Sequence, residues 1–304
     1  MPGLNATTYS TIVIQHDNAD GFLKCTYPTL CRREVSAETA LGVLPLWSDS
    51  DSQRFLQNLE RSSSSPHRND ALDLVLSCLN WSLGDYPIFL WTPRRPGALP
   101  SDWLAPRITQ LTEHLRMCRE PLYAAHFSYC EPSIYQASNA QLPQGHALRK
   151  AKPRDLEAVA RLCKEFADDS VFFPLSIERA RIEARELIMK AQVWVYDADG
   201  DIATICAVTR NSQRVSAITK VYTTPAWRRH GCAEFLVREV TGRLFDCGRD
   251  CVVLYVGHDN TAQRVYDRVG YAGLCGKDKS ERIEDSLELG LSGLIEDTVT
   301  HGYL

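Results

Sequence analysis

The dipeptide Asp199-Gly200 stands between two runs rich in β-branched and aromatic residues, QVWVY before it and IATICAVTR after it. Asp-Gly in this setting is the strongest short-range signal for a two-residue β-hairpin turn. The next run, VSAITKVY, follows a turn at Asn211-Ser212 and predicts a third strand over residues 215–222. This part of the chain must therefore fold around an antiparallel sheet.

Apolar residues recur at helical spacing on both sides of these three strands and predict flanking helices. The expected helices cover residues 155–167, 176–191, 233–247 and 261–270, with Ser176 as the N-cap of the second and Gly248 ending the third. The run CVVLYV, residues 251–256, is apolar at every position, as in a strand buried on both faces. With short strands expected at 146–151 and 286–291, the pattern indicates an α/β (α+β) fold with a mixed, mainly antiparallel central sheet flanked by helices.

A chain of 304 residues is longer than one average domain, so two domains are expected. The polar segment around Pro143 and Gly145 places the boundary at Gln144, which gives domains 1–144 and 145–304. The first half reads as mixed α and β, with a strand-like run at 86–92 and a helical pattern at 102–118. It contains no catalytic constellation.

Composition restricts the function classes. The formal net charge of -4 argues against a nucleic-acid footprint, which needs a net basic face. The 11 cysteines are odd in number and form no C-x-x-C pair, which favours reduced thiols in the cytoplasm and no metal site. No apolar run reaches the length of a membrane span, so no membrane partner is expected.

The stretch VYTTPAWRRHGCAEF joins the third strand of the sheet to the following helix, which is expected to begin near Arg228. The first amides of a helix have no intrahelical acceptor, and together with the helix dipole they favour an anion. Gly231 lets a phosphate approach the backbone, and Arg228 and Arg229 add positive charge. The alternative is a solvated basic turn that only starts a helix.

The neighbouring residues favour the anion site. Thr224-Pro225, R-x-x-G-x-A at 228–233, VVLYV, Asn260 and VYDRVGY occur in the order found in the GNAT superfamily of N-acetyltransferases, and residues 146–290 resemble that family. The resemblance implies that the amides of Arg229 to Ala233 hold the pyrophosphate of acetyl-CoA and that the main chain of Val221 to Thr223 pairs with its pantetheine. The implied cofactor-binding residues are Val221, Tyr222, Thr223, Arg228, Arg229, His230, Gly231, Cys232, Ala233, Asn260 and Tyr266.

Tyr266 lies four residues before Gly270-Tyr271 and matches the family's Y-x-x-x-G-[FY] ending, which implies that it protonates the leaving thiolate. A phenol with a pKa of about 10 suits that role, although an amphipathic core tyrosine would show the same pattern. No carboxylate lies on the strand VSAITKV, so the base candidates are His258 and Asp259, with Asp168, Asp169 and a water chain as alternatives. Cys232 is interpreted as a small helix residue rather than a covalent nucleophile.

The stretch ADDSVFFPL falls where the family's acceptor-binding loop lies. Its acids and aromatic residues would suit a cationic amine with an apolar body, and a helix cap over a core is the alternative. The residues expected to bind the acceptor are Asp168, Asp169, Phe172, Phe173 and Tyr222. The layout of the first half resembles a degenerate GNAT-like domain, in which the prolines of TPRRPGALPSDW would remove phosphate-binding amides.

The resemblance therefore implies an acetyl-CoA-dependent N-acetyltransferase acting by direct attack of a primary amine, without a metal. A small-molecule acceptor is expected, because no acidic or basic docking run is present. The alternatives are a non-catalytic acyl-CoA-binding regulatory protein, an interaction scaffold, or an acetyltransferase for protein N-termini or lysines. We expect a cytoplasmic monomer or homodimer.

Overall fold

The computed structural model describes the backbone of residues 10–16, 53–61, 71–79, 89–91, 116–169, 175–277 and 285–292, and the side chains of 124–169 and 175–277. Contacts divide the chain into two units, Met1–Met117 with Leu291–Tyr303, and Cys118–Gly290 with Leu304.

The first unit contains a sheet with the strand order β1-β2-β3-β4, in which every neighbouring pair is antiparallel. Its strands are β1 (Ser10–His16), β2 (Gln53–Arg61), β3 (Ala71–Leu79) and β4 (Phe89–Trp91). The strand-like run at 86–92 is confirmed by β4. The helix predicted over 102–118 is wrong for its last three residues, which begin a long strand, and its other residues lie outside the described part of the chain.

The second unit is built on a seven-stranded sheet with the order β11-β5-β10-β9-β8-β7-β6. The strands are β5 (Arg116–Cys130), β6 (His146–Lys150), β7 (Val193–Ala198), β8 (Asp201–Asn211), β9 (Val215–Thr223), β10 (Cys251–Gly257) and β11 (Asp285–Ser292). β9 and β10 are parallel, whereas β5 with β10 and the successive pairs from β6 to β9 are antiparallel. The mixed, mainly antiparallel sheet confirms the predicted fold class.

The hairpin signal is also confirmed. Asp199 and Gly200 both adopt positive φ, 53° and 94°, as the two central residues of a type I′ turn require. The Gly200 amide donates a hydrogen bond of 2.8 Å to Asp197 Oδ1, which holds the turn against β7. The strand that the sequence did not predict in this sheet is β5, which lies between β10 and β11.

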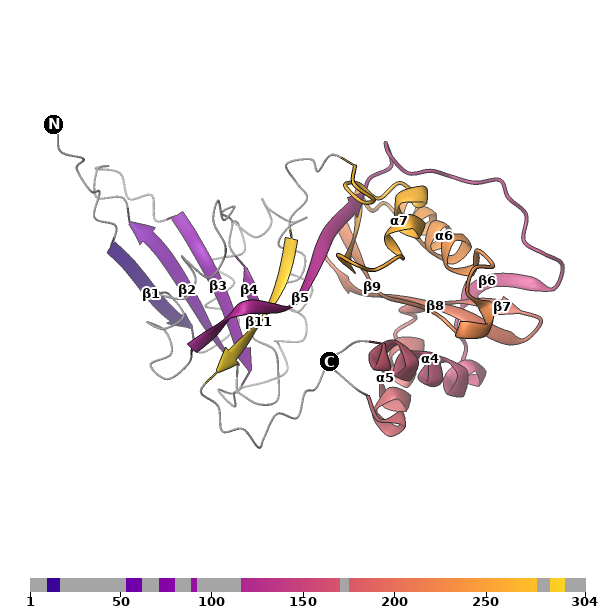
Figure 1. The fold of residues 1–304 in the computed structure, drawn as a ribbon, viewed down its shortest axis with the longest axis horizontal. Coiled ribbons are helices and arrows are strands. Elements are labelled where there is room, and N and C mark those ends of the chain that lie inside the picture. The colour runs from indigo at the N-terminus through magenta and orange to yellow at the C-terminus, as the bar shows by residue number, and fades with distance from the viewer. Residues whose placement is uncertain are drawn as a thin grey trace. The chain divides into compact units, whose positions relative to one another are not determined.

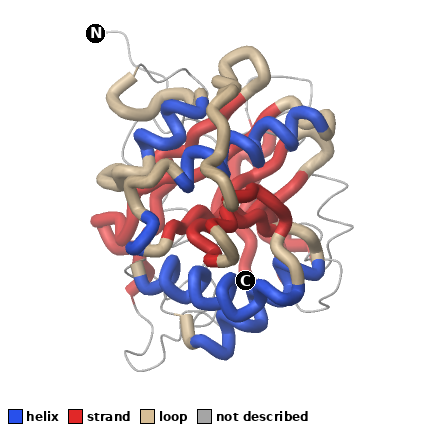
Figure 2. The backbone as a smooth tube through the Cα atoms, turned by 90° about the vertical axis from the view of Figure 1, so that its right-hand side faces the viewer, coloured by secondary structure: helices blue, strands red, loops and turns tan. Residues whose placement is uncertain are grey.

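Two helices cover each face of this sheet (Figures 1 and 2). α4 (Leu156–Asp168) and α5 (Ile177–Met189) share one core with β7, β8 and Tyr222. α6 (Cys232–Asp246) and α7 (Gln263–Val269) share another with β10 and the opposite faces of β7 and β8. Short 3₁₀ turns, Pro153–Asp155 and Pro225–Trp227, precede α4 and α6. Ser176 caps α5 as predicted, because its Oγ accepts a hydrogen bond from the Arg179 amide.

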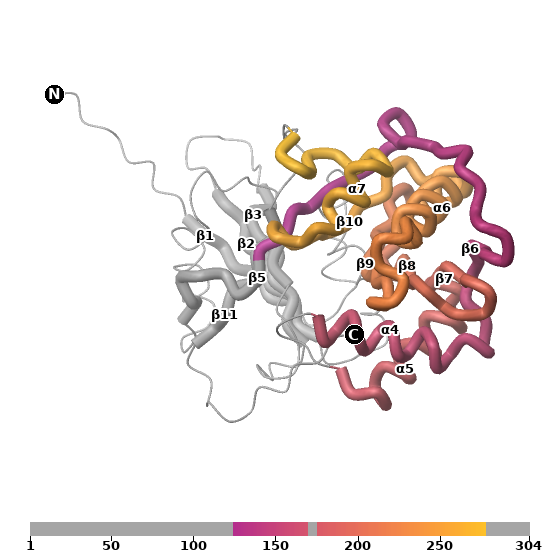
Figure 3. Tube along the Cα trace, turned by 45° about the vertical axis from the view of Figure 1, so that its right-hand side comes forward, coloured from indigo at the N-terminus to yellow at the C-terminus, as the bar shows by residue number. Residues whose placement is uncertain are grey.

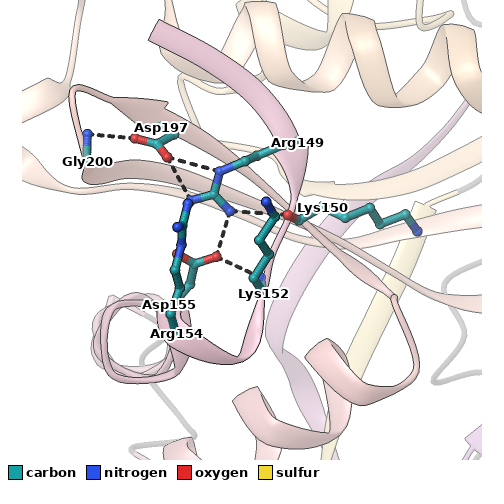
Figure 4. Close-up of polar contacts among 7 residues, drawn as sticks. All are labelled: Arg149, Lys150, Lys152, Arg154, Asp155, Asp197 and Gly200. Carbon is teal, nitrogen blue, oxygen red and sulfur yellow. Dashed lines mark hydrogen bonds and ion pairs between the residues drawn. The ribbon is translucent and has the colours of Figure 1, made fainter. Parts of the chain in front are cut away.

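A partly buried ion-pair network fixes the start of α4 to the edge of the sheet (Figure 4). Arg149 on β6 donates two hydrogen bonds to Asp155, at 2.6 and 3.0 Å, and two to Asp197 Oδ2 on β7, at 3.0 and 2.7 Å. The Lys152 amide donates a further bond to Asp155. Burial raises the pKa of Asp155, but the bonds from Arg149 and Lys152 outweigh it and hold this pKa below its ordinary value.

Candidate cofactor site and active site

The centre of the sheet opens between β9 and β10 (Figure 3). The two strands pair over only four residues, Val215–Ile218 against Cys251–Leu254. Beyond them β9 stays paired with β8 as far as Thr223, and β10 stays paired with β5 as far as Gly257. Within the residues that the structure describes, the edge of β9 that faces β10 therefore has no strand partner from Thr219 to Thr223. An unpaired strand edge of this kind can accept another extended chain.

The turn that follows β9 has a backbone conformation that lets a ligand approach its main chain closely. Arg228 is extended, Arg229 and Gly231 adopt left-handed conformations with φ of 66° and 79°, and α6 begins at Cys232. The prediction that the helix begins near Arg228 is wrong, because Pro225 starts a separate 3₁₀ turn and Arg228 leaves it in an extended conformation. A left-handed non-glycine residue such as Arg229 costs about 1–2 kcal/mol, a strain commonly found at functional sites.

Five consecutive amides of this turn point to an anion site. Within the described part of the chain, the N–H groups of Arg229 to Ala233 donate no hydrogen bond, whereas the Gly231 carbonyl accepts one from Phe235 in the first turn of α6. A β-carbon at Gly231 would meet only the Phe235 ring, at 3.7 Å, and the backbone is exposed. Free amides at a helix start, joined by the exposed Arg229 and His230, suit a diphosphate.

The Arg228 side chain turns away from this row of amides. Its Nε donates to the Thr223 carbonyl at 3.2 Å, and its Nη2 donates to Asp169 Oδ2 at 3.0 Å and to the Tyr222 hydroxyl at 3.1 Å. Its guanidinium carbon also lies 5.4 Å from the centre of the Tyr222 ring. Burial, followed by the nearby Asp169 and Glu165, raises the pKa of Tyr222. The structure therefore brings together Tyr222, Thr223, Arg228 and Asp169.

The remaining predicted residues are placed as follows. Asn260 lies in the exposed turn after β10, where its Oδ1 accepts a hydrogen bond of 2.9 Å from the Ala262 amide. Tyr266 is 7% exposed, and its ring meets the Tyr271 ring edge-on at 6.0 Å. Asp168 pairs with Lys164 at 2.5 Å. The predicted acceptor residues Phe172 and Phe173 lie outside the described residues.

His258 and Asp259 are exposed at the end of β10. The His258 ring stacks on the His126 ring of β5, with centroids 4.1 Å apart. Sequence reasoning missed His126 because it did not place β5 beside β10. The alternation in HFSYC, residues 126–130, was the available signal for a strand.

Comparison with known families identifies one part of the chain. Residues 160–284 match the family model described as an acetyltransferase (GNAT) domain. Residues 160–284 form a GNAT acetyltransferase domain. The resemblance inferred from the sequence is confirmed for this part of the chain, and the enzyme class is acetyltransferase.

Solved structures agree with the GNAT fold. A GCN5-related N-acetyltransferase from Sphaerobacter thermophilus is 17% identical, with a TM-score of 0.53, and the match covers 92% of this chain and 94% of that one. A GNAT-family acetyltransferase from Colwellia psychrerythraea is 11% identical, with a TM-score of 0.54, and covers 86% and 96%. At these identities the similarity shows the fold alone. No curated protein matches the chain significantly.

Cys232, the first residue of α6, has its thiol in the core. Cys232 is 2% exposed, and burial raises the pKa of its thiol despite contact with the Tyr196 hydroxyl. That hydroxyl lies 2.8 Å from Nδ1 of His146 in a hydrogen bond. A buried, protonated thiol is a poor nucleophile.

The described part of the chain contains no group of three or more His, Cys, Asp and Glu side chains that could hold a metal ion. Among its helices, none combines the length and the apolar character that crossing a membrane requires.

Proposed function

We propose that this protein is an acetyl-CoA-dependent N-acetyltransferase that transfers the acetyl group to a primary amine by direct attack. The observation that carries the proposal is the row of five free amides, Arg229 to Ala233, directly after the unpaired edge of β9. One element suits a diphosphate and the other an extended amide-containing chain, and the two lie next to each other in the order that coenzyme A presents those groups.

Each part of the cofactor has candidate residues. The amides of Arg229 to Ala233 would hold the diphosphate, with the exposed side chains of Arg229 and His230 nearby. The main chain of Val221 to Thr223 would pair with pantetheine. Asn260 and Tyr266 follow the adjacent strand β10, in the turn and in the helix that packs against α6.

Acetyl transfer needs an acid that protonates the departing coenzyme A thiolate and a base that takes the proton of the attacking amine. In our proposal Tyr266 is the acid, and His258 or Asp259 is the base, directly or through water. A covalent acetyl-cysteine at Cys232 is disfavoured because its thiol is buried and its pKa is raised. The amine would therefore attack the thioester directly.

The acceptor is proposed to be a small cationic amine with an apolar body. Asp168 and Asp169 lie at the C-terminal end of α4, and Tyr222 is the aromatic residue that Asp169 reaches through Arg228. Phe172 and Phe173 follow in the chain. A cytoplasmic location, a monomeric or homodimeric state, the absence of nucleic-acid and membrane partners, and the tandem arrangement of residues 1–144 and 145–304 remain predictions.

A non-catalytic acyl-CoA-binding protein is the second candidate. The observation that favours it is that β9 carries no carboxylate and instead presents Lys220, whose Nζ is paired with Glu183 Oε1 at 2.6 Å. Such a protein would bind the cofactor without turnover.

Two measurements test the proposal. Calorimetry with acetyl-CoA should show one site per chain, and a protein without affinity would be neither enzyme nor regulator of this kind. Release of coenzyme A should then be followed with tyramine, spermidine, glucosamine and a lysine-containing peptide with a free N-terminus. Turnover with a small amine supports the proposal, turnover with the peptide alone indicates a protein acetyltransferase, and binding without any turnover favours the regulatory candidate.

A further inference from the structure

We propose that Arg228 is a positioning residue that fixes the acceptor side of the site to the cofactor-binding end of β9, so that acetyl-CoA binding orders the end of α4. This inference rests on the proposed function. It assigns Arg228 a role different from the diphosphate contact that the sequence resemblance implies.

One guanidinium contacts three parts of the proposed site. Thr223 contributes the last carbonyl of β9, Tyr222 contributes a ring and a hydroxyl from the same strand end, and Asp169 is the C-cap of α4. α4 packs on one face of the sheet and α6 on the other. Arg228 lies in the short connection between β9 and α6, and its side chain reaches the α4 face.

The geometry depends on the fork of an arginine. Two separate nitrogens donate: Nε donates to the Thr223 carbonyl, and Nη2 donates to Asp169 Oδ2 and to the Tyr222 hydroxyl. The planar guanidinium is held against the buried Tyr222 ring, which is 8% exposed. A lysine ends in a single nitrogen and cannot reproduce these two donor positions.

The ion pair between Arg228 and Asp169, called the bridge below, positions the end of α4 and contributes little to the stability of the fold. The Arg228 and Asp169 side chains are 48% and 61% exposed, and ion pairs so open to water stabilise a fold only weakly. A displacement of about 1 Å at a reacting group, by contrast, can reduce a rate by about 100-fold. Loss of the bridge should therefore appear in acceptor kinetics and in the order of α4, with little change in melting temperature.

The turn proposed to bind the diphosphate can couple acetyl-CoA binding to the order of α4. The amides proposed to hold the diphosphate begin at Arg229, the residue directly after Arg228. A ligand that fixes this turn also fixes the backbone from which the Arg228 side chain extends. Through Asp169 the same restraint reaches the C-terminal end of α4, and two sites linked in this way affect each other reciprocally.

The test compares Arg228→Gln and Asp169→Asn with a matched control, Arg181→Gln. Arg181 pairs with Glu157 at 3.0 Å, and these side chains are 44% and 68% exposed, which closely matches the bridge in length and exposure. Three quantities are measured for each variant: the acetyl-CoA dissociation constant, hydrogen exchange of the α4 C-terminal amides with and without acetyl-CoA, and kcat and KM for the best amine of the panel.

In the parent protein and in Arg181→Gln, acetyl-CoA should slow exchange at the end of α4. In both bridge variants this slowing should be lost, and kcat/KM for the amine should fall by about 10-fold. The acetyl-CoA dissociation constant should stay within about twofold of the parent. The exchanged pair Arg228→Asp with Asp169→Arg should recover part of both effects, which a merely structural role would not produce.

If acetyl-CoA slows hydrogen exchange at the end of α4 as much in Arg228→Gln as in the parent, the proposed role of Arg228 is wrong. A large rise in the acetyl-CoA dissociation constant of this variant, with amine kinetics intact, would also overturn it, since that is the result of a diphosphate contact. Because the exchange measurement needs no acceptor, it decides the question even for a protein that turns over none of the amines. Failure of the parent itself to bind acetyl-CoA would instead remove the proposed function.

Discussion

Two glycines at opposite ends of α6 allow the cofactor site to be tested with a built-in control. Gly231 before the helix and Gly248 after it have nearly the same positive φ, 79° and 82°. A β-carbon at Gly231 would meet only the Phe235 ring at 3.7 Å, and one at Gly248 would meet nothing within 4 Å. Replacement of either glycine by alanine therefore adds the same backbone strain without a steric clash.

The two replacements should lower the melting temperature by a similar amount but differ in their effect on acetyl-CoA binding. An L-residue in the left-handed region costs about 1–2 kcal/mol, and a unit of this size loses about 2–4 °C in Tm per kcal/mol, so both variants should melt about 2–8 °C lower than the parent. Only Gly231→Ala should also weaken acetyl-CoA binding. If its methyl group displaces one charge-assisted amide bond, worth about 1.5–3 kcal/mol, the dissociation constant rises by about 10-fold to 150-fold.

Thermal melting and calorimetry with acetyl-CoA, run on both variants, separate the two effects. A Gly231→Ala protein that melts like Gly248→Ala yet binds acetyl-CoA as tightly as the parent would refute the assignment of this turn to the diphosphate. Gly231→Val should bind still more weakly, because a β-branched side chain both resists the conformation and crowds the phosphate.

Three further outcomes are expected. Tyr266→Phe should lower kcat by about 100-fold with the acetyl-CoA dissociation constant unchanged, measured by steady-state kinetics, whereas normal turnover would leave Tyr266 as a packing residue. Cys232→Ala should retain turnover, and loss of activity with cofactor binding intact would favour an acyl-enzyme. Asp155→Asn should lower the free energy of unfolding by about 3 kcal/mol at pH 7, measured by urea unfolding. Because the pKa of Asp155 lies below its ordinary value of 3.8 in the folded protein, its contribution is present above that pH and is lost as the pH falls further, so the difference between variant and parent should shrink on acidification below pH 3.8.

The sequence by itself determined the elements whose signals are local. The Asp199-Gly200 turn, the Ser176 cap and the fully apolar strand β10 each depend on residues within a few positions of one another, and each is found where it was predicted. The glycine-containing turn before α6 was likewise visible in the order of residues 224 to 233. Apolar periodicity predicted the helix from residue 233, one residue after its observed start at Cys232. The expectation that it begins near Arg228 was wrong, because Pro225 starts a separate 3₁₀ turn and Arg228 is extended.

Tertiary structure alone decided which distant residues meet. β5 pairs with β10 across more than a hundred residues, and only that pairing brings His126 onto His258. Arg228 and Asp169 are 59 residues apart in the chain and become partners only because α4 packs on the face of the sheet to which the end of β9 contributes Tyr222. The opening between β9 and β10 has no local signal either, since each strand remains fully paired on its other side. Periodicity reports which face of a segment is buried, and it carries no information about the neighbour that buries it.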